Sequence, residues 1–399
     1  MTTNQNGKHF LLILILGFLT AMGPLATDIY LPAFADIAQK LNTHISNVSL
    51  SLSSFFIGLS IGQLIYGPLL ERFGRKKPIY VGLTIYILSS LGCTVATSVN
   101  ELIIYRFFQA IGACGGLVSA RAVVKDLFKN EEVARIFSLL LVVVAVSPII
   151  APTVGGFITA YFSWRYVFAI LVILAFLVFV ASFFLLPESK LPDPNYSLNI
   201  ITVFKNYIGL INNSQFAIYA VAGSVSYSGV YSYLSGSPHL YFEIFEVSQN
   251  QYSLIFAIIA AGLIGASQVN RLVLKRQSVE NIVFKALIVQ CFFAITLIIF
   301  YFIDITGLYI TTFLIFGYMT CLGFIFPNAS ALSLTNLGHT AGNASALLGS
   351  IQMVLGAIAS AIVSLLQDKS AFSMLIVMTF CAFSGWIILR FNRKKVLVS

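Results

Sequence analysis

The chain has 399 residues, of which 58% are hydrophobic and only 9% are charged. So little polar surface excludes a water-soluble globular protein and makes the lipid bilayer the expected solvent. The formal net charge of +9 would point to nucleic acid in a soluble protein, but here the basic residues follow loops between apolar segments, so no nucleic-acid partner is expected.

Apolar stretches of the length that a membrane-spanning helix needs, about 20 residues, fill nearly the whole chain. Short polar breaks separate them. We therefore predict twelve transmembrane helices. In chain order, their expected ranges are 10–31, 48–70, 79–97, 102–122, 136–160, 164–186, 216–238, 252–269, 282–302, 308–332, 344–366 and 372–391.

Lysine and arginine gather in alternate loops. If the N-terminus lies inside, the even-numbered loops and the two tails hold all but four of the 23 basic residues. The four exceptions are Lys40, Arg165 and Lys369 in odd-numbered loops and Arg106 inside a predicted helix. Because positively charged loops stay on the cytoplasmic side, both termini are expected in the cytoplasm.

A polar stretch at 190–213 is the longest interruption between predicted helices. We interpret it as a cytoplasmic linker between an N-terminal six-helix bundle at 1–189 and a C-terminal bundle with a short tail at 214–399. The segments 67–72 and 265–271, after the second and eighth helices, are faintly similar. This similarity indicates an internal duplication, which many membrane transporters have.

Asp28 and Arg106 are charged residues that lie inside predicted helices and in the outer half of the membrane. By the helical rise, Asp28 in the first helix lies about 28 Å above the inner surface and Arg106 in the fourth about 22 Å above it. A charged side chain at this depth costs free energy unless it faces water or an oppositely charged partner. We therefore expect Asp28 and Arg106 to pair with each other and to take part in proton coupling. The alternatives are an interfacial Asp28 and a snorkelling Arg106. Gly23 and Pro24 predict a bent or broken helix beside Asp28.

The loop after the second helix, at 67–77, reads GPLLERFGRKK. Glycine at both ends, an acid and a run of basic residues are more than topology requires, although a plain positive-inside loop is the alternative. Asp126, at the foot of the fourth helix, is the expected partner of Arg75. The loop is therefore expected to contact the fourth helix.

The fifth helix contains SPIIAPTVGG at 147–156. Prolines remove backbone donors, and paired glycines allow other helices to come close. Pro148, Pro152, Gly155 and Gly156 therefore predict a bend with tight helix contact. An ordinary proline kink is the alternative.

Together these motifs resemble those of the major facilitator superfamily. The loop after the second helix resembles its signature loop, with Glu71 where an aspartate is usual. The run LIIYRFFQAIG at 102–112 is similar to its second motif, with Ala110 where many members have glycine. The fifth-helix run resembles the antiporter motif of drug:proton exporters, with Ser147 where a glycine is usual. Four further runs are similar to the Bcr/CflA subfamily, named for resistance to bicyclomycin and chloramphenicol: ATDIYLP at 26–32, YLSGSP at 233–238, PNASA at 327–331 and ASALLG at 344–349.

The resemblance implies an all-α membrane protein of the major facilitator fold, with two six-helix bundles around a central cavity. It implies proton-coupled efflux of small amphipathic compounds such as drugs, by alternating access, in the inner membrane of a bacterial cell. The expected partners are the small-molecule substrate, protons and the lipid bilayer, with the monomer as the functional unit. No cofactor is expected, because the proton gradient is the driving force. In the family the signature loop gates the cytoplasmic side, and its counterparts here are Gly67, Glu71, Arg72, Gly74, Arg75 and Asp126.

Substrate contacts are expected from uncharged polar side chains near the cavity, because these suit an amphipathic compound. Aromatic rings can also hold cations. The alternative role of each residue is a hydrogen bond to a neighbouring helix. The candidates are Tyr30, Tyr227, Tyr231, Asn328, Asn343 and Gln352.

Two other functions remain open at this stage. The first keeps the fold and exports an endogenous metabolite, such as a siderophore or an amino-acid derivative, with drug export incidental. The second, a membrane enzyme or sensor, would need clustered histidine, cysteine or carboxylate side chains or an appended soluble domain. The four histidines are scattered near helix ends, so neither a metal site nor an enzyme activity is expected.

Overall fold

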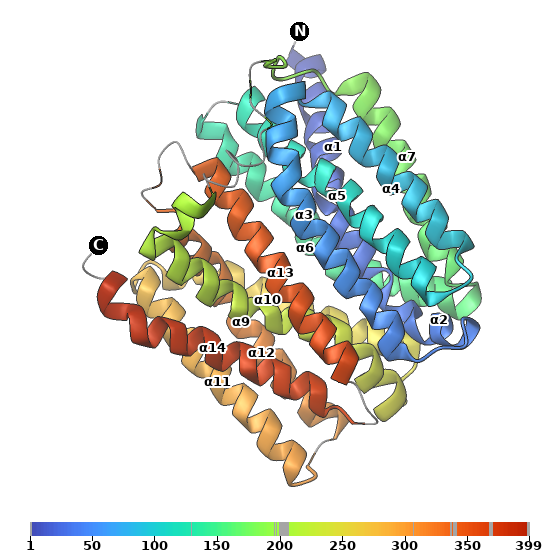
Figure 1. The fold of residues 1–399 in the computed structure, drawn as a ribbon, viewed down its shortest axis with the longest axis vertical. Coiled ribbons are helices and arrows are strands. Elements are labelled where there is room, and N and C mark those ends of the chain that lie inside the picture. The colour runs from blue at the N-terminus through green and yellow to red at the C-terminus, as the bar shows by residue number, and fades with distance from the viewer. Residues whose placement is uncertain are drawn as a thin grey trace.

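The computed structural model describes residues 2–128, 130–194, 196, 198, 207–305, 307–335, 337, 341–366 and 370–396. Within these residues every long element is a helix, and twelve long helices lie at the twelve ranges predicted from the sequence (Figure 1). The all-α fold class is therefore confirmed. The predicted linker at 190–213 lies partly outside the described residues.

The helices form two consecutive sets, which we call the first group and the second group. The first group comprises α1 Thr2–Asp28, the short η1 Leu31–Ala33, α2 Phe34–Lys40, α3 Ile45–Phe73, α4 Lys76–Val95, α5 Val99–Leu127, α6 Asn130–Tyr161 and α7 Arg165–Leu185. The second group comprises α9 Ser214–His239, the π-helical η2 Leu240–Ile244, α10 Gln249–Val273, α11 Val279–Phe302, α12 Leu308–Ser333, α13 Ala341–Leu366 and α14 Phe372–Val396.

Among the described residues, eleven of the twelve long helices are long and apolar enough to cross a membrane. The twelfth, α9, is rich in serine, glycine and tyrosine, and most of its residues are buried. It contacts α12, α13 and α14 of its own group and α3 of the first group. Because α9 lies against protein on several sides, hydroxyls and small residues can serve helix packing there.

Each group packs chiefly within itself, and the two groups meet chiefly along two pairs of helices, with a smaller contact between α3 and α9. In one pair α3 faces α13, and in the other α6 faces α10 (Figure 1). We call the end of the bundle that carries the loop between α3 and α4 the basic end, because Arg72, Arg75, Lys76 and Lys77 lie there. The opposite end, where α3 begins, is the far end.

Small residues bring helices of the first group close together. A Cβ atom on Gly58 would lie 2.4 Å from the Phe107 carbonyl oxygen, and one on Gly112 would lie 2.5 Å from the Tyr86 backbone nitrogen. Both distances are too short for any side chain. The glycines of α3 and α5 therefore serve helix packing, as small residues do in membrane bundles.

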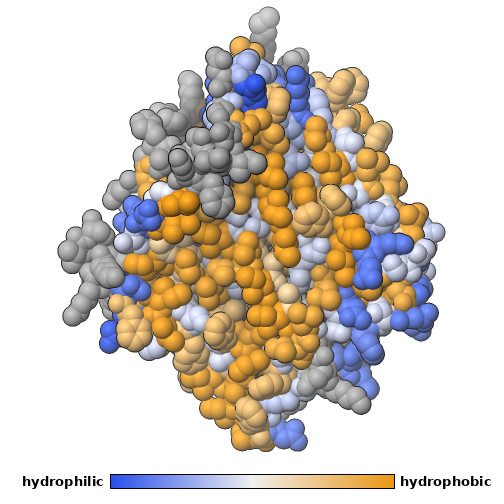
Figure 2. All heavy atoms as spheres, in the orientation of Figure 1, coloured by the Kyte–Doolittle hydropathy of each residue, from blue (hydrophilic) through white to orange (hydrophobic). Residues whose placement is uncertain are grey.

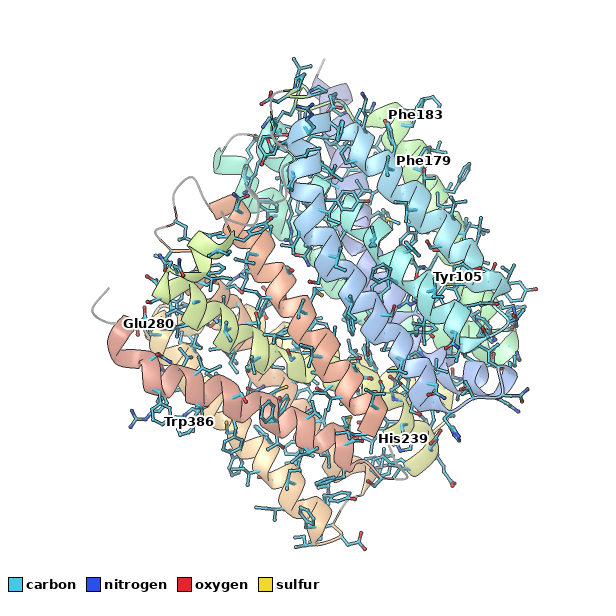
Figure 3. The ribbon with its side chains drawn as sticks, in the orientation of Figure 1. Tyr105, Phe179, Phe183, His239, Glu280 and Trp386 are labelled. Carbon is cyan, nitrogen blue, oxygen red and sulfur yellow. The ribbon has the colours of Figure 1, made fainter. Side chains whose placement is uncertain are left out.

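Apolar side chains cover most of the middle of the visible face, and hydrophilic ones gather toward its edges (Figure 2). Aromatic rings strengthen the outer helix pairs of the first group. Phe179 and Phe183 project from α7 (Figure 3), and their ring centroids lie 5.5 and 5.8 Å from that of Tyr80 on α4. An apolar outer surface of this kind suits contact with lipid, because the hydrocarbon core of a bilayer offers no hydrogen-bond partner to a polar side chain.

Candidate functional site

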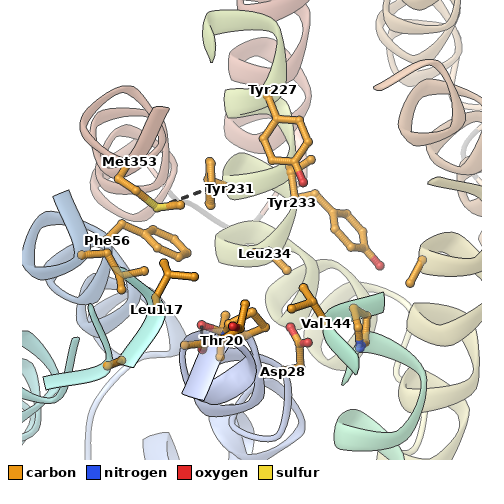
Figure 4. Close-up of a pocket in the computed structure, with 18 of the residues that line it drawn as sticks. Thr20, Asp28, Phe56, Leu117, Val144, Tyr227, Tyr231, Tyr233, Leu234 and Met353 are labelled. Atoms are coloured by element: carbon orange, nitrogen blue, oxygen red, sulfur yellow. Dashed lines mark hydrogen bonds between the residues drawn. The ribbon is translucent and has the colours of Figure 1, made fainter. Parts of the chain in front are cut away.

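A cavity of about 330 Å³ lies between the two groups, with walls from both of them. Its surface is mostly apolar and includes aromatic and methionine side chains. Figure 4 shows Asp28 on one side of it and Tyr227, Tyr231 and Tyr233 of α9 across from Asp28. A cavity of this size and composition suits an amphipathic molecule.

Asp28 lies at a break in the first transmembrane segment. It is the last residue of α1, and the chain turns at Ile29 and Tyr30 before η1 and α2. Only 6% of Asp28 is exposed, and its carboxylate accepts a 2.9 Å hydrogen bond from the Ser147 hydroxyl of α6. The predicted break is therefore present, but it lies four residues after Pro24, which is inside α1.

Arg106 of α5 is fully buried beside this break. Its Nη1 donates a 3.1 Å bond to the Ala26 carbonyl and a 2.6 Å bond to the Gln109 side-chain oxygen. Its guanidinium also lies 4.7 Å from the Tyr30 ring centroid and 4.1 Å from that of Phe55. The last carbonyls of a helix have no partner within it, and a cation there also interacts favourably with the helix dipole. Arg106 thus caps the C-terminal end of α1.

The expected direct ion pair between Asp28 and Arg106 is absent from the described residues. Asp28 faces α6 and the cavity, whereas Arg106 lies among rings of the first group. The helical rise gave the depth of each residue but not the direction of its side chain. Arg106 is instead linked to Asp28 through the backbone, since it binds the carbonyl two residues earlier.

The SPIIAPTVGG segment of α6 packs against the break in α1. Ser147 bonds to Asp28, and Pro148 lines the cavity. Gly155 lies so close to the chain after α1 that a Cβ atom on it would be 2.1 Å from the Ile29 carbonyl oxygen. The close contact predicted from the glycines is therefore present, and it positions the residue that follows Asp28.

The same segment also meets α10 of the second group. The Ser253 hydroxyl donates a 2.8 Å bond to the Pro152 carbonyl. A Cβ atom on Gly156 would lie 2.6 Å from that hydroxyl oxygen. The segment is thus in contact with the cavity, with the break in α1 and with the opposite group.

Serine hydroxyls join the two groups elsewhere toward the far end. Ser49 donates a 2.9 Å bond to the Ser235 carbonyl, and the hydroxyls of Ser53 and Ser360 lie 2.8 Å apart. These bonds connect α3 with α9 and α13. The groups are therefore in direct contact on the far side of the cavity.

Gly155→Ala is expected to lower the rate of the export that the resemblance implies by tenfold or more. The added methyl group must displace the backbone after Asp28, and overpacking of this kind costs about 1–3 kcal/mol. Transport of a fluorescent substrate in membrane vesicles measures the effect. Gly265→Ala on α10 is the matched control, because no atom lies within 4 Å of its Cβ position. Equal rates for the two variants would contradict this account of the glycine.

An ion-pair cluster around Arg75 holds the loop between α3 and α4. Arg75 Nε donates a 2.7 Å bond to Asp126 of α5, so the predicted partner is present. Arg75 Nη1 bonds to Glu71 and to the Leu70 carbonyl, both at 3.1 Å. Only 4% of the Arg75 side chain is exposed. The cluster therefore fixes this loop to the foot of α5.

Residues that follow α7 join the same cluster. The Glu188 carboxylate accepts a 2.6 Å bond from the Arg75 backbone N–H at the start of α4, and the Lys190 ammonium pairs with Glu71. Gly74 has a φ of +81°, a left-handed conformation that favours glycine. The signature loop is thus tied to the beginning of the stretch predicted as the linker.

Asp126→Asn is expected to lower the thermal stability of the purified protein. The substitution removes one charge from a mostly buried pair and leaves Arg75 partly uncompensated, at a cost of about 1–3 kcal/mol. The melting temperature in detergent measures this loss. Asp304→Asn, at an exposed position with a φ of +54°, is the matched control and should leave the melting temperature unchanged. An Asp126→Asn protein with the same melting temperature as this control would show that the pair of Arg75 with Asp126 contributes nothing to thermal stability.

A second cavity, of about 430 Å³, lies between the groups at the basic end. Gly67 of α3 and Asn343 of α13 are among its walls. Arg121 of α5 lines both this cavity and the central one. The predicted fourth helix, 102–122, included Arg121, but we counted its charge with a loop, so sequence reasoning missed its position. A charge inside a predicted helix was the signal that could have found it.

Two of the six expected substrate contacts line the central cavity, namely Tyr227 and Tyr231. Asn343 lines the second cavity instead. Apolar residues such as Phe56 and Met353 supply much of the central wall, and a search for polar side chains passed over them.

Tyr30, Asn328 and Gln352 do not line either cavity. The Tyr30 hydroxyl lies 2.9 Å from that of Ser51, and Asn328 exchanges two amide hydrogen bonds of 2.8 and 3.1 Å with Asn270 of α10. These contacts match the alternative role, a hydrogen bond between helices. No group of His, Cys, Asp or Glu side chains that could hold a metal ion is present in the described part of the chain.

Known proteins resemble the chain in sequence and in fold. The family model described as Major Facilitator Superfamily matches residues 16–361. The MFS-type transporter YdgK of Bacillus subtilis is 34% identical over 393 residues, 96% of both chains. A bicyclomycin resistance protein homolog of Haemophilus influenzae is 28% identical over 378 residues, 95% of both chains, which confirms the resemblance to the Bcr/CflA subfamily. The crystal structure of a D-xylose-proton symporter has a TM-score of 0.77 at 15% identity, over 94% of this chain and 97% of that one, a likeness of fold alone.

Proposed function

The chain belongs to the Major Facilitator Superfamily and is a transporter, and we propose that it exports small amphipathic compounds, such as drugs, in exchange for protons. The name of the Haemophilus influenzae relative, a bicyclomycin resistance protein homolog, supports a drug as cargo. The central cavity supports an amphipathic cargo, because its wall combines a large apolar surface with the hydroxyls of Tyr227, Tyr231 and Tyr233.

The carboxyl of Asp28 is the observation that carries the exchange with protons. It is buried at the cavity wall, and Ser147 is its hydrogen-bond donor. A carboxylate in such surroundings is costly, so either a bound proton or a cationic part of the cargo must compensate it. Proton and cargo then compete for one group, and competition of this kind couples the entry of one to the release of the other.

Alternating access follows if the two groups rock about the central cavity. We take 1–189 and 214–399 as the two moving bodies, with 190–213 as their linker. The basic residues of the loop around Arg75 support a cytoplasmic basic end, and the far-end serine contacts then close the outer side. Opening to the outside must break these neutral hydrogen bonds, each of which contributes only about 1 kcal/mol. The Arg75 cluster, with Gly67, Glu71, Arg72, Gly74 and Asp126, is the proposed cytoplasmic gate.

We propose the inner membrane of a bacterial cell as the location, and the basic loops support both termini in the cytoplasm. We also take the monomer as the functional unit, as the resemblance to the family implies. In this proposal the proton gradient alone supplies the energy, and no cofactor takes part.

Everted membrane vesicles from an efflux-deficient host test the exchange. Respiration acidifies their interior, and a substrate added outside should release protons from the lumen, seen as dequenching of a trapped acridine dye. A panel of antibiotics, cationic dyes, siderophores and amino-acid derivatives also tests the metabolite alternative. Vesicles without the protein are the control. Substrate accumulation that persists at full rate after a protonophore would contradict exchange with protons.

A further inference from the structure

Within the described part of the chain, the wall of the central cavity carries two side chains that are charged at neutral pH, and their signs are opposite. Asp28 lies at the break in α1, and Arg121 lies where this cavity meets the second one. We propose that the two charges bind opposite ends of the cargo, so that the preferred cargo is an elongated amphipathic zwitterion with its anionic group on Arg121. This assignment rests on the proposed export function and adds the class of compound.

Arg121 has no hydrogen bond or ion pair within the described residues, whereas the charges of the Arg75 cluster are paired. Arg75 bonds to Glu71 and Asp126, and Lys190 also pairs with Glu71. The Arg121 side chain is exposed, although its position lies inside α5, because two cavities reach it. A charged side chain inside a membrane helix is costly without a partner, and such residues mark transport pathways.

An anionic group is the ligand that suits this side chain best. A guanidinium presents five N–H donors, and it binds a carboxylate through two parallel hydrogen bonds. Lys125, one helical turn further toward the basic end, lines the second cavity and has no ion pair within the described residues. The two carboxylates that line the second cavity, Glu71 and Asp126, are paired with Arg75. An anionic group that enters from the basic end therefore meets two cations without a pair, Lys125 first and Arg121 next.

The packing of α1 against α5 gives the spacing of the two charges. A Cβ atom on Gly116 of α5 would lie 2.9 Å from the Leu19 carbonyl oxygen of α1. Gly116 and Leu19 therefore lie at the same height along the bundle. From that level Asp28 lies nine residues along α1, and Arg121 lies five residues along α5 in the opposite direction. These fourteen residues correspond to about 21 Å between the two Cα levels. A free α-amino acid is too short to reach both charges, whereas an elongated aromatic zwitterion can do so.

The wall between the two charges suits the body of such a molecule. The Tyr231 ring centroid lies 4.6 Å from that of Phe56 and 5.9 Å from that of Tyr227, so both groups contribute to one aromatic surface. Aromatic faces pack against flat apolar bodies and also attract cations. A cationic end near Asp28 would then compete with a proton there, as the proposed exchange requires.

Two dyes that differ in one charge test the assignment. Rhodamine 110 is a zwitterion with a free carboxylate, and rhodamine 123 is its methyl ester, a cation. Proton-driven transport of each is measured in everted vesicles for the wild type and for Arg121→Gln, Arg121→Lys and Lys125→Gln. Arg121→Gln should raise the KM for rhodamine 110 by about tenfold or more, the effect of losing one charge-assisted hydrogen bond, and should leave rhodamine 123 within about twofold. Arg121→Lys should raise the KM for rhodamine 110 less than Arg121→Gln does.

Lys125→Gln is the matched control, because it removes a cation one turn away that does not line the central cavity. It should raise the KM for rhodamine 110 less than Arg121→Gln does, because a charge at the rim acts only through the rate of association. An equal loss of both dyes in Arg121→Gln would overturn the assignment, because it would indicate a structural role. A wild type that exports rhodamine 123 and not rhodamine 110 would also overturn it and would leave the export function standing. A wild type that exports neither dye would contradict the proposed export of aromatic amphipathic compounds.

Discussion

Asp28→Asn is expected to abolish uphill export and to leave downhill exchange of substrate in place. The amide keeps the size of the side chain and can still bond to Ser147, but it cannot bind or release a proton. For one proton exchanged, a pH difference of one unit drives about tenfold accumulation of substrate. That accumulation should fall to none in the variant. Reconstituted liposomes with an imposed pH gradient measure it.

Counterflow separates the loss of coupling from the loss of folding. In counterflow an excess of unlabelled substrate drives the entry of labelled substrate with no proton movement, so Asp28→Asn should retain it at substrate concentrations high enough to offset its weaker binding. Ser182→Ala, at a buried position of α7 that lines neither cavity, is the control and should keep both activities. Full accumulation by Asp28→Asn would show that another group carries the proton.

Arg106→Met is expected to eliminate transport and to reduce stability by several kcal/mol. Methionine fills part of the space but leaves two buried oxygens, the Ala26 carbonyl and the Gln109 side chain, without this donor. Each buried group that loses its partner costs about 1–3 kcal/mol. Without its cap the end of α1 should lose its fixed position, and Asp28 with it. The melting temperature and the export rate in vesicles measure both effects.

Arg106→Lys distinguishes a positioning role from a role in proton transfer. Lysine keeps the positive charge but lacks the planar group that lies against Tyr30 and Phe55, so the export rate should fall while the number of protons exchanged per substrate stays the same. Gln109→Ala, which removes only one of the two acceptors, should have the smaller effect on stability. An Arg106→Met protein that transports at the wild-type rate would contradict the capping role.

Hydropathy alone was sufficient to predict where the helices lie in the sequence, because a bilayer fixes the length and composition of a helix that spans it. Even α9, which falls below the usual threshold for a membrane span, was predicted, because 216–238 was one of the twelve apolar stretches. The pairing of Arg75 with Asp126 was also predictable, because the loop and the foot of α5 had to lie at the same membrane surface.

The direction of side chains around each helix was not predictable in the same way. Asp28 and Arg106 lie at similar depths, yet one faces the cavity and the other lies among the rings of the first group. For the same reason Asn328 was expected at the cavity but bonds to Asn270 of a neighbouring helix. A pattern of apolar residues predicts where one helix lies in the sequence. The partner of a polar side chain depends instead on how two helices are rotated against each other.

Proton release from the purified protein tests the role of Asp28 most directly. A substrate that is exported in vesicles is added to the detergent-solubilised protein in a lightly buffered solution, and a pH indicator reports the protons released. If cargo and proton compete for Asp28, the wild type should release up to one proton per substrate bound, whereas Asp28→Asn should bind substrate more weakly and release none at a saturating concentration. Equal release from the two proteins would contradict the account.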